Sequence, residues 1–341
     1  MSLIFRLTGI LMLLLSAGLA PANAEPLAKT LFGAQKLPAA TAPASYGFYS
    51  KGCFAGGVAI ATDGPAWQAM RLSRNRRWGH PDLIAVVAQL SEKARADGWN
   101  GLLVGDISQP RGGPMLTGHA SHQIGLDADI WFTPMPDRRL SAGERESMSA
   151  VSMLKGDSLY VDDRIWTKAH EAVLRNAAKF PQVERILVHP GIKKKLCDTV
   201  TGDRSWLYKV RPFWGHNYHF HLRIGCPKGS TGCKGQAEPS RSDGCDKSLD
   251  WWFTEEPWRK PKPGTKKEPK ARDVMTMAAL PPACRSVLDA PSPVSEAAVT
   301  VTGPRTAIAA RTDAAAPVPA SAFAPAPKPA EMPLPTPRPE E

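Results

Sequence analysis

Two histidine-rich windows, far apart along the chain, place the strongest constraint on how this sequence can fold. The first window, GHASHQIGLDADIWF, contains His119 and His122. The second, GHNYHFHLRIG, contains His216, His219 and His221. Five of the eight histidines therefore fall in two short segments. Histidines gathered in this way suggest one site at which the two segments meet.

Both windows are predicted to contain a β-strand. In Leu126–Phe132 apolar residues alternate with polar ones that include Asp129, so one face of the strand is expected to be core and the other to carry carboxylates. In Asn217–Ile224 the same alternation places His219 and His221 on one face, with backbones about 6.6 to 7 Å apart. The two strands could be neighbours in one sheet.

Histidines and a carboxylate placed in this way predict a catalytic zinc site. Zinc in such sites takes three protein ligands from His and Asp or Glu and leaves a position for water, whose pKa falls to about 7. The first window offers a histidine and Asp129, and the second offers His219 or His221. If one of this pair is a ligand, the other can accept a proton from the attacking water. The alternative is a set of ordinary polar residues on a half-exposed sheet; the number of histidines favours a metal.

The first 24 residues have the pattern of a secretion signal. Arg6 precedes an apolar run, and small residues end the segment at Ala24, where we expect cleavage. The run is shorter than the roughly 20 apolar residues that span a bilayer, and no later segment is long and apolar enough to do so. We therefore expect an exported protein without a transmembrane segment in its mature form.

Composition divides the rest of the chain. Residues 25–45, rich in Ala and Pro, predict a flexible segment before a globular domain over 46–256. Residues 257–289 are interpreted as a basic Pro-rich linker, anchored by a disulfide at Cys284, and residues 290–341 as a disordered Pro/Ala-rich tail. The formal net charge of +11 favours polyanionic surroundings, but much of it lies in the linker. Export argues against nucleic acid as a partner.

Periodicity within the globular part predicts a mixed α+β domain. Helices are expected over 81–97, with Gly98 as the C-terminal cap, and over about 164–180, with Asp162 or Asp163 as the N-cap. Strands are expected over 101–107, 126–132, 183–189 and 217–224. The elements do not follow a regular βαβ repeat, which favours α+β over a doubly wound sheet.

Six cysteines in an exported chain predict three disulfides. Their pairing cannot be chosen from the cysteines alone, since six allow fifteen arrangements. A zinc cluster is the rival interpretation, but the sequence has no Cys-x-x-Cys pair.

The two windows, GHASHQIGLDADIWF and HNYHFHLRIGCP, together with RRWGHPDL, DRSWLYKVRPFWGH and the six cysteines, resemble the penicillin-insensitive murein endopeptidases. These belong to a wider group of zinc peptidases that includes lysostaphin, the D-Ala-D-Ala metallopeptidases and the hedgehog-type fold. The resemblance runs from about Tyr46 to Cys284. It implies a small antiparallel sheet with flanking helices of the hedgehog/D-Ala-D-Ala-peptidase type, stapled by disulfides.

The resemblance also implies roles for individual residues. Zinc would be bound by His122, Asp129 and His221, with His119 as an extra ligand or a substrate contact. His219 would be the general base, and His216 would stabilise the developing oxyanion. An acidic family position corresponds to Asp157, but Tyr160 stands where the family has a histidine, so the sequence leaves open whether a second metal binds there. The implied disulfides are Cys53–Cys284, Cys197–Cys245 and Cys226–Cys233.

The implied activity is hydrolysis of the D-alanyl to meso-diaminopimelyl cross-links between stem peptides of periplasmic peptidoglycan. Because no serine acyl-enzyme forms, β-lactams should not inhibit it. One alternative is a zinc D,D- or L,D-carboxypeptidase that acts on uncross-linked stem peptides. Another is a catalytically silent wall-binding module, against which the complete set of His122, Asp129, His219 and His221 argues.

Overall fold

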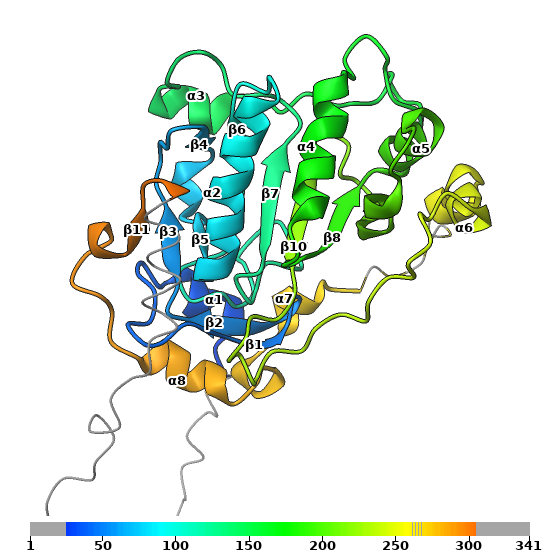
Figure 1. Ribbon diagram of the computed structural model, residues 1–341. Coiled ribbons are helices and arrows are strands. Elements are labelled where there is room, and N and C mark those ends of the chain that lie inside the picture. The colour runs from blue at the N-terminus through cyan, green and yellow to red at the C-terminus, as the bar shows by residue number, and fades with distance from the viewer. Residues whose placement is uncertain (1–24, 261, 263, 265, 267, 305–341) are drawn as a thin grey trace, which may run out of the picture.

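The computed structural model describes residues 25–260, 262, 264, 266 and 268–304 of the 341-residue chain. The expected signal peptide and the tail from residue 305 onward lie outside the described residues. The described part is a mixed α+β structure, as predicted, built around one six-stranded sheet (Figure 1). None of its described helices is long and apolar enough to cross a membrane.

The six-stranded sheet carries both histidine-rich windows. Its strands, in spatial order, are β4 (Trp67–Ala69), β6 (Leu102–Val104), β7 (Asp127–Trp131), β10 (His219–Ile224), β8 (Val183–Val188) and β9 (Val210–Pro212). The central pairs are antiparallel, but β4–β6 and β8–β9 are parallel, so the expected antiparallel sheet is in fact mixed. Parallel neighbours need a crossover connection, and α2 (Pro81–Ala96) and α5 (Pro190–Thr199) lie in these two connections.

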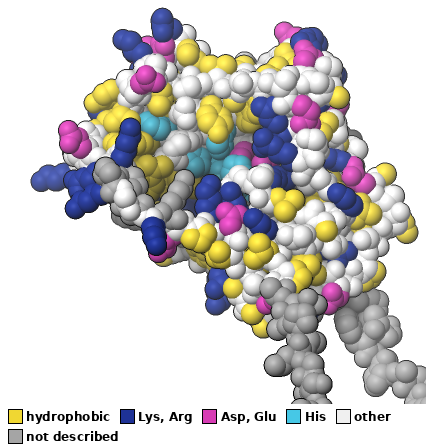
Figure 2. Space-filling view, turned by 180° about the vertical axis from the view of Figure 1, so that it is seen from behind, with side chains coloured by type: hydrophobic (Ala, Val, Ile, Leu, Met, Phe, Trp, Pro, Cys, Tyr) yellow, Lys and Arg dark blue, Asp and Glu magenta, His cyan; other side chains and the backbone are white. Residues whose placement is uncertain are grey.

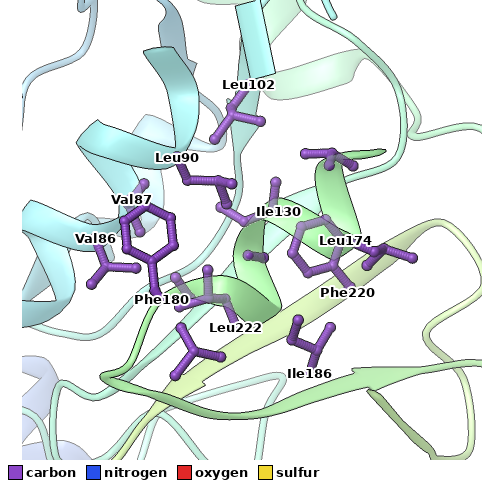
Figure 3. Packing of buried hydrophobic residues seen from close by; sticks show 14 of the residues in the cluster. Val86, Val87, Leu90, Leu102, Ile130, Leu174, Phe180, Ile186, Phe220 and Leu222 are labelled. Atoms are coloured by element: carbon purple, nitrogen blue, oxygen red, sulfur yellow. The ribbon is translucent and has the colours of Figure 1, made fainter. Parts of the chain in front are cut away.

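One face of the sheet is the hydrophobic core. Helices α2 and α4 (Lys168–Lys179) cover this face (Figure 1). Figure 3 shows Phe220 and Leu222 of β10 beside Ile130 of β7, with Leu90 of α2 and Leu174 of α4 packed nearby. Full burial of one such side chain stabilises the fold by about 1.5 to 3 kcal/mol. Because side chains alternate along a strand, the polar residues of β7 and β10 lie on the opposite face.

The two predicted helices form, but only the first begins where expected. Helix α2 starts after His80, whose Nδ1 accepts the backbone N–H of Asp82 at 3.2 Å, and Gly98 has a φ of +81° just beyond its end. Helix α4 starts at Lys168 with Thr167 as N-cap, so the expected cap at Asp162 or Asp163 is wrong. The Asp162 carboxylate instead accepts the backbone N–H of Arg164 at 3.0 Å, which closes a turn ahead of the helix.

The two ends of the described chain pack together, which differs from the expected flexible segment over 25–45. Helix α1 (Ala28–Gly33) buries Ala28 and Phe32 completely, against Met277 and Leu280 from the expected linker. The expected tail also contributes a strand. In it, β11 (Thr300–Val301) pairs in parallel with β3 (Val58–Ile60). Composition alone did not reveal that the few apolar residues of each end find partners at the other.

Smaller elements complete the fold. They are β1 (Ala44–Phe48), β2 (Lys51–Ala55), β5 (Trp78–Gly79), α3 (Ala142–Ser147), α6 (Lys247–Asp250), α7 (Ala271–Val274), α8 (Ala283–Asp289) and the 3-10 helices η1 (Leu72–Arg74), η2 (Ser205–Lys209), η3 (Trp251–Phe253), η4 (Glu256–Trp258), η5 (Met277–Ala279) and η6 (Ala297–Val299). Three disulfides are present, and they join the pairs that the family resemblance implies: Cys53–Cys284, Cys197–Cys245 and Cys226–Cys233. The first connects β2 to α8 across 231 residues of sequence.

Candidate metal centre

Strands β7 and β10 place a carboxylate and an imidazole directly opposite each other. His221 is the register partner of Asp129, and His221 Nε2 lies 2.8 Å from Asp129 Oδ1. His219, two residues earlier on the same face, is opposite Trp131, and its Nε2 lies 3.7 Å from the same oxygen. The period of two in both strands therefore fixes the lateral position of these three groups.

The loop before β7 brings two more imidazoles to Asp129. His122 Nε2 is 3.3 Å from Asp129 Oδ1, and His119 Nε2 is 3.2 Å from Oδ2. His122 has a φ of +70°, a left-handed conformation that is uncommon for a residue with a side chain. Asp127 holds it there, since its carboxylate accepts the backbone N–H of His122 at 3.2 Å. Ser108 also donates a hydrogen bond to the carbonyl of His122.

These groups form a compact set of possible ligand atoms, which we call the metal-binding set. One atom each from His119, His122, Asp129 and His221 lies within 4.8 Å of every other. Nε2 of His122, Nε2 of His221 and Oδ1 of Asp129 are buried, and none has a hydrogen-bond partner among the described residues. Buried polar atoms without a partner are energetically costly, so the set fits a bound divalent cation. Two or three imidazoles with one carboxylate are ligands typical of zinc.

The charges in this set favour cation binding. Burial by itself raises the pKa of Asp129. The surrounding imidazoles of His119, His221 and His219 have a larger, opposite effect, so the pKa lies well below its usual range. Burial holds the pKa of His221 well below its usual value, so its imidazole is neutral, as a metal ligand must be. Burial also opposes protonation of His122, but the Asp129 carboxylate outweighs it and raises the pKa of His122 to about 9. A cation would therefore replace a proton at this position.

His216 and His219 lie beside this ligand set. The ring centroids of His216 and His219 are 4.4 and 5.3 Å from that of His221. Burial lowers the pKa of both, that of His216 to about 4, so both are neutral at pH 7. His216 Nδ1 lies 2.6 Å from the carbonyl oxygen of Trp214, to which it must donate, while its Nε2 has no partner among the described residues. Neither ring nitrogen of His219 has such a partner, so this imidazole can accept a proton.

A pocket adjoins the metal-binding set, and part of it was missed by sequence reasoning. The pocket has a volume of about 300 Å³. It extends from Asp129 and His219 past Asp106 to Arg71 and Arg74. Figure 2 shows histidine side chains in a hollow with basic side chains along its edge. Asp106 lies two residues after the end of β6, so a polar residue just beyond a buried strand was the available signal.

The sequence left open a second metal site near Asp157 and Tyr160. Asp157 is exposed, and Tyr160 is 53% exposed and stacks on Phe253 with ring centroids 5.3 Å apart. Neither belongs to a group of potential metal ligands in the part of the chain that the structure describes.

Comparison with known proteins agrees with the resemblance. Residues 45–289 match the family described as penicillin-insensitive murein endopeptidase. The curated protein of that name from Haemophilus influenzae is 43% identical over 226 residues, which are 64% of this chain and 74% of that protein. The one from Klebsiella pneumoniae subsp. pneumoniae is 38% identical over 268 residues, 79% of this chain and 94% of that protein. The one from Pectobacterium atrosepticum is 37% identical over 283 residues, 83% and 96% respectively. The chain therefore belongs to the penicillin-insensitive murein endopeptidase family.

Proposed function

We propose that this protein is an exported zinc endopeptidase that hydrolyses the D-alanyl to meso-diaminopimelyl cross-link of peptidoglycan in the periplasm and is not inhibited by β-lactams. Family membership supports a murein endopeptidase activity. The observation that carries the metal assignment is the convergence of three buried ligand atoms without a hydrogen-bond partner among the described residues, which are Nε2 of His122, Nε2 of His221 and Oδ1 of Asp129. We further infer that the mixed sheet with helices on one face is the hedgehog/D-Ala-D-Ala-peptidase type of fold.

Zinc would be held by His122, Asp129 and His221, with His119 as an additional ligand or a substrate contact. When bound, zinc supplies a Lewis acid that polarises the scissile carbonyl and makes water a better nucleophile at neutral pH. Asp127 positions His122 by accepting its backbone N–H. The Asp129 carboxylate lies within 3.3 Å of Nε2 of His119, His122 and His221. Such supporting contacts fix the orientation of metal ligands.

His219 would act as the general base and then as the general acid. Its neutral imidazole accepts a proton from the attacking water and returns it to the leaving diaminopimelyl amine. His216 would donate a hydrogen bond to the developing oxyanion. With Nδ1 committed to the carbonyl of Trp214, Nε2 of His216 carries a proton only when the ring is charged, and burial opposes that charge in the free protein. Stabilisation by His216 therefore requires that the developing negative charge itself raise its pKa.

The proposal is tested with purified cross-linked muropeptide dimers and the zinc-loaded mature chain, in the presence of a β-lactam. Wild type should release monomers, detected by mass spectrometry. His219→Ala should retain zinc but lose about 100-fold or more in rate, whereas His221→Ala should lose zinc as well. Asp198→Asn, at an exposed position of α5 that pairs with Lys194, is the matched control and should retain both.

Each other outcome has a definite meaning. No monomer release by wild type would refute the endopeptidase assignment. Release of D-alanine from uncross-linked stem peptides, without cleavage of dimers, would identify a carboxypeptidase instead. Unimpaired cleavage by His219→Ala would refute only the proposed base.

A further inference from the structure

The pocket beside the metal-binding set has a basic far wall that the proposed mechanism does not use. Arg71 and Arg74 line this wall, while Trp131 and Tyr218 line the pocket alongside His219. The Arg71 guanidinium lies 5.6 Å from the centre of the Trp131 ring, and its Nη2 donates to the carbonyl of Met148 at 2.7 Å. Arg71 is therefore held against an aromatic wall of the pocket.

The Arg74 side chain is hydrogen-bonded to Asp106 and is also partly exposed. Its Nη1 donates to Asp106 Oδ2 at 3.1 Å, and Arg76 Nη1 donates to the same oxygen at 2.9 Å. The Asp106 side chain is only 2% exposed, whereas that of Arg74 is 45% exposed. An arginine has five N–H donors, so the contact with Asp106 fixes the guanidinium and leaves donors free to face the pocket.

The backbone around Arg74 is strained in a way that supports a functional role. Arg71 and Asn75 flank the short helix η1 with φ values of +55° and +51°. Left-handed conformations at non-glycine residues are unfavourable and cluster at functional sites. Here they turn the chain so that both Arg71 and Arg74 line the same pocket.

The charge balance of this wall suits an anion. Arg74 and Arg76 both donate to the Asp106 carboxylate, and Glu146 is a further acid near Arg71 and Arg74. Glu146 does not line the pocket, and it accepts the backbone N–H and the hydroxyl of Ser73, each at 2.8 Å. The described residues that line the pocket therefore include two guanidinium groups, those of Arg71 and Arg74, and Asp106 is the one acid among them outside the metal-binding set.

We propose that Arg74, supported by Arg71, binds the free carboxylate at the D-centre of the diaminopimelyl residue on the amine side of the scissile bond. This inference rests on the proposed function. The D-centre of that residue carries both the nitrogen of the cross-link and a carboxylate on the same carbon. A substrate with this amide at the metal and His219 presents its carboxylate a short distance away, and a forked guanidinium matches a carboxylate in shape and charge. Arg74 is thus a specificity-determining residue.

The experiment compares two cross-linked dimers that differ only in this carboxylate, which is free in one and amidated in the other. Wild type should cleave the amidated dimer with a kcat/KM lower by about tenfold to hundredfold, the range of a charge-assisted hydrogen bond. In Arg74→Gln, kcat/KM should fall by this factor on the dimer with the free carboxylate and change little on the amidated dimer. The variant should therefore cleave the two dimers at similar rates. Arg74→Lys should restore part of the preference, because it keeps the charge without the fork. Arg241→Gln, at an exposed position away from the pocket, should behave as wild type.

Three results would overturn the inference. The first is equal cleavage of both dimers by wild type. The second is an equal loss of kcat/KM on both dimers in Arg74→Gln, which would indicate that Arg74 has only a structural role through Asp106. If wild type cleaves neither dimer, the proposed function fails and calorimetry decides the inference separately. In that measurement the stem-peptide monomer with a free carboxylate should bind at least about tenfold more tightly than its amide, and equal or absent binding would refute carboxylate recognition.

Discussion

Replacing Asp127 with asparagine removes the negative charge of a carboxylate that is completely buried next to the metal-binding set. The Asp127 carboxylate accepts hydrogen bonds from Nε and Nη2 of Arg223, the latter at 3.1 Å, and from the backbone N–H of His122. Burial raises the pKa of Asp127, but Arg223 lowers it further, so the group is ionised in the folded protein. Asparagine keeps the shape of the side chain and one acceptor oxygen. It cannot neutralise Arg223.

The expected loss of stability depends on the contacts that Arg223 keeps in the variant. Breaking a buried ion pair by removing one partner costs about 3 to 5 kcal/mol, because the other charge stays buried. Arg223 is only 7% exposed, but its guanidinium lies 4.0 Å from the centre of the Tyr49 ring and donates to Gln236 at 2.8 Å. These contacts place the loss near the lower limit, at about 3 kcal/mol, or about 6 to 12 °C in Tm for a domain of this size. Zinc affinity should fall about 10- to 100-fold, because Asp127 positions His122.

Urea unfolding followed by tryptophan fluorescence measures the first quantity, and competition with a chelator measures the second. Asp198→Asn is the matched control, since its exposed carboxylate pairs with Lys194 at 3.0 Å on the surface of α5 and should contribute less than about 1 kcal/mol. Equal urea midpoints for the two variants would refute the argument that Asp127 neutralises Arg223. Unchanged zinc affinity of Asp127→Asn would refute its role in positioning His122.

Three further predictions concern stability. Burial lowers the pKa of His170 to about 4, so only the unfolded chain takes up this proton as pH falls below about 6.5. The free energy of unfolding should therefore fall between about pH 6.5 and pH 4, and His170→Gln should flatten this dependence in urea titrations; parallel curves would contradict it. Cys284→Ser should lose about 2 to 5 kcal/mol in the same assay, and a wild type unaffected by reductant would argue against the role of Cys53–Cys284. Truncation after Asp289 removes β11 and should lower the urea midpoint, whereas truncation after Pro304 retains β11 and should not; equal midpoints would show that β11 adds no stability.

The sequence predicted the strand faces but not every element that surrounds the site. Alternation in two short segments was enough to place His219 and His221 on one face and Asp129 on a polar face. The left-handed conformation of His122 has no comparable pattern, because it depends on the buried Asp127 carboxylate. Asp106 was missed for a similar reason, since its partners Arg74 and Arg76 are distant in sequence.

The ends of the domain were predicted least well. Composition rich in Ala and Pro predicted flexible ends, and Ala28 and Phe32, although four residues apart as in a helix, form too short a pattern to outweigh it. Their burial depends on Met277 and Leu280, which lie at the other end of the chain. A pattern that is read locally cannot show a partner so far away.

Joining the first and last parts of the domain also sets the order in which the molecule can be completed. Cys53 must wait for a cysteine 231 residues later, and β3 waits for a strand that comes later still. Contacts between such distant residues form slowly and only after most of the polypeptide is present. A chain interrupted before residue 277 would lack Met277 and Leu280, which pack against Phe32, and Cys284, which pairs with Cys53. The two ends of the domain can therefore pack together only after synthesis has passed Cys284.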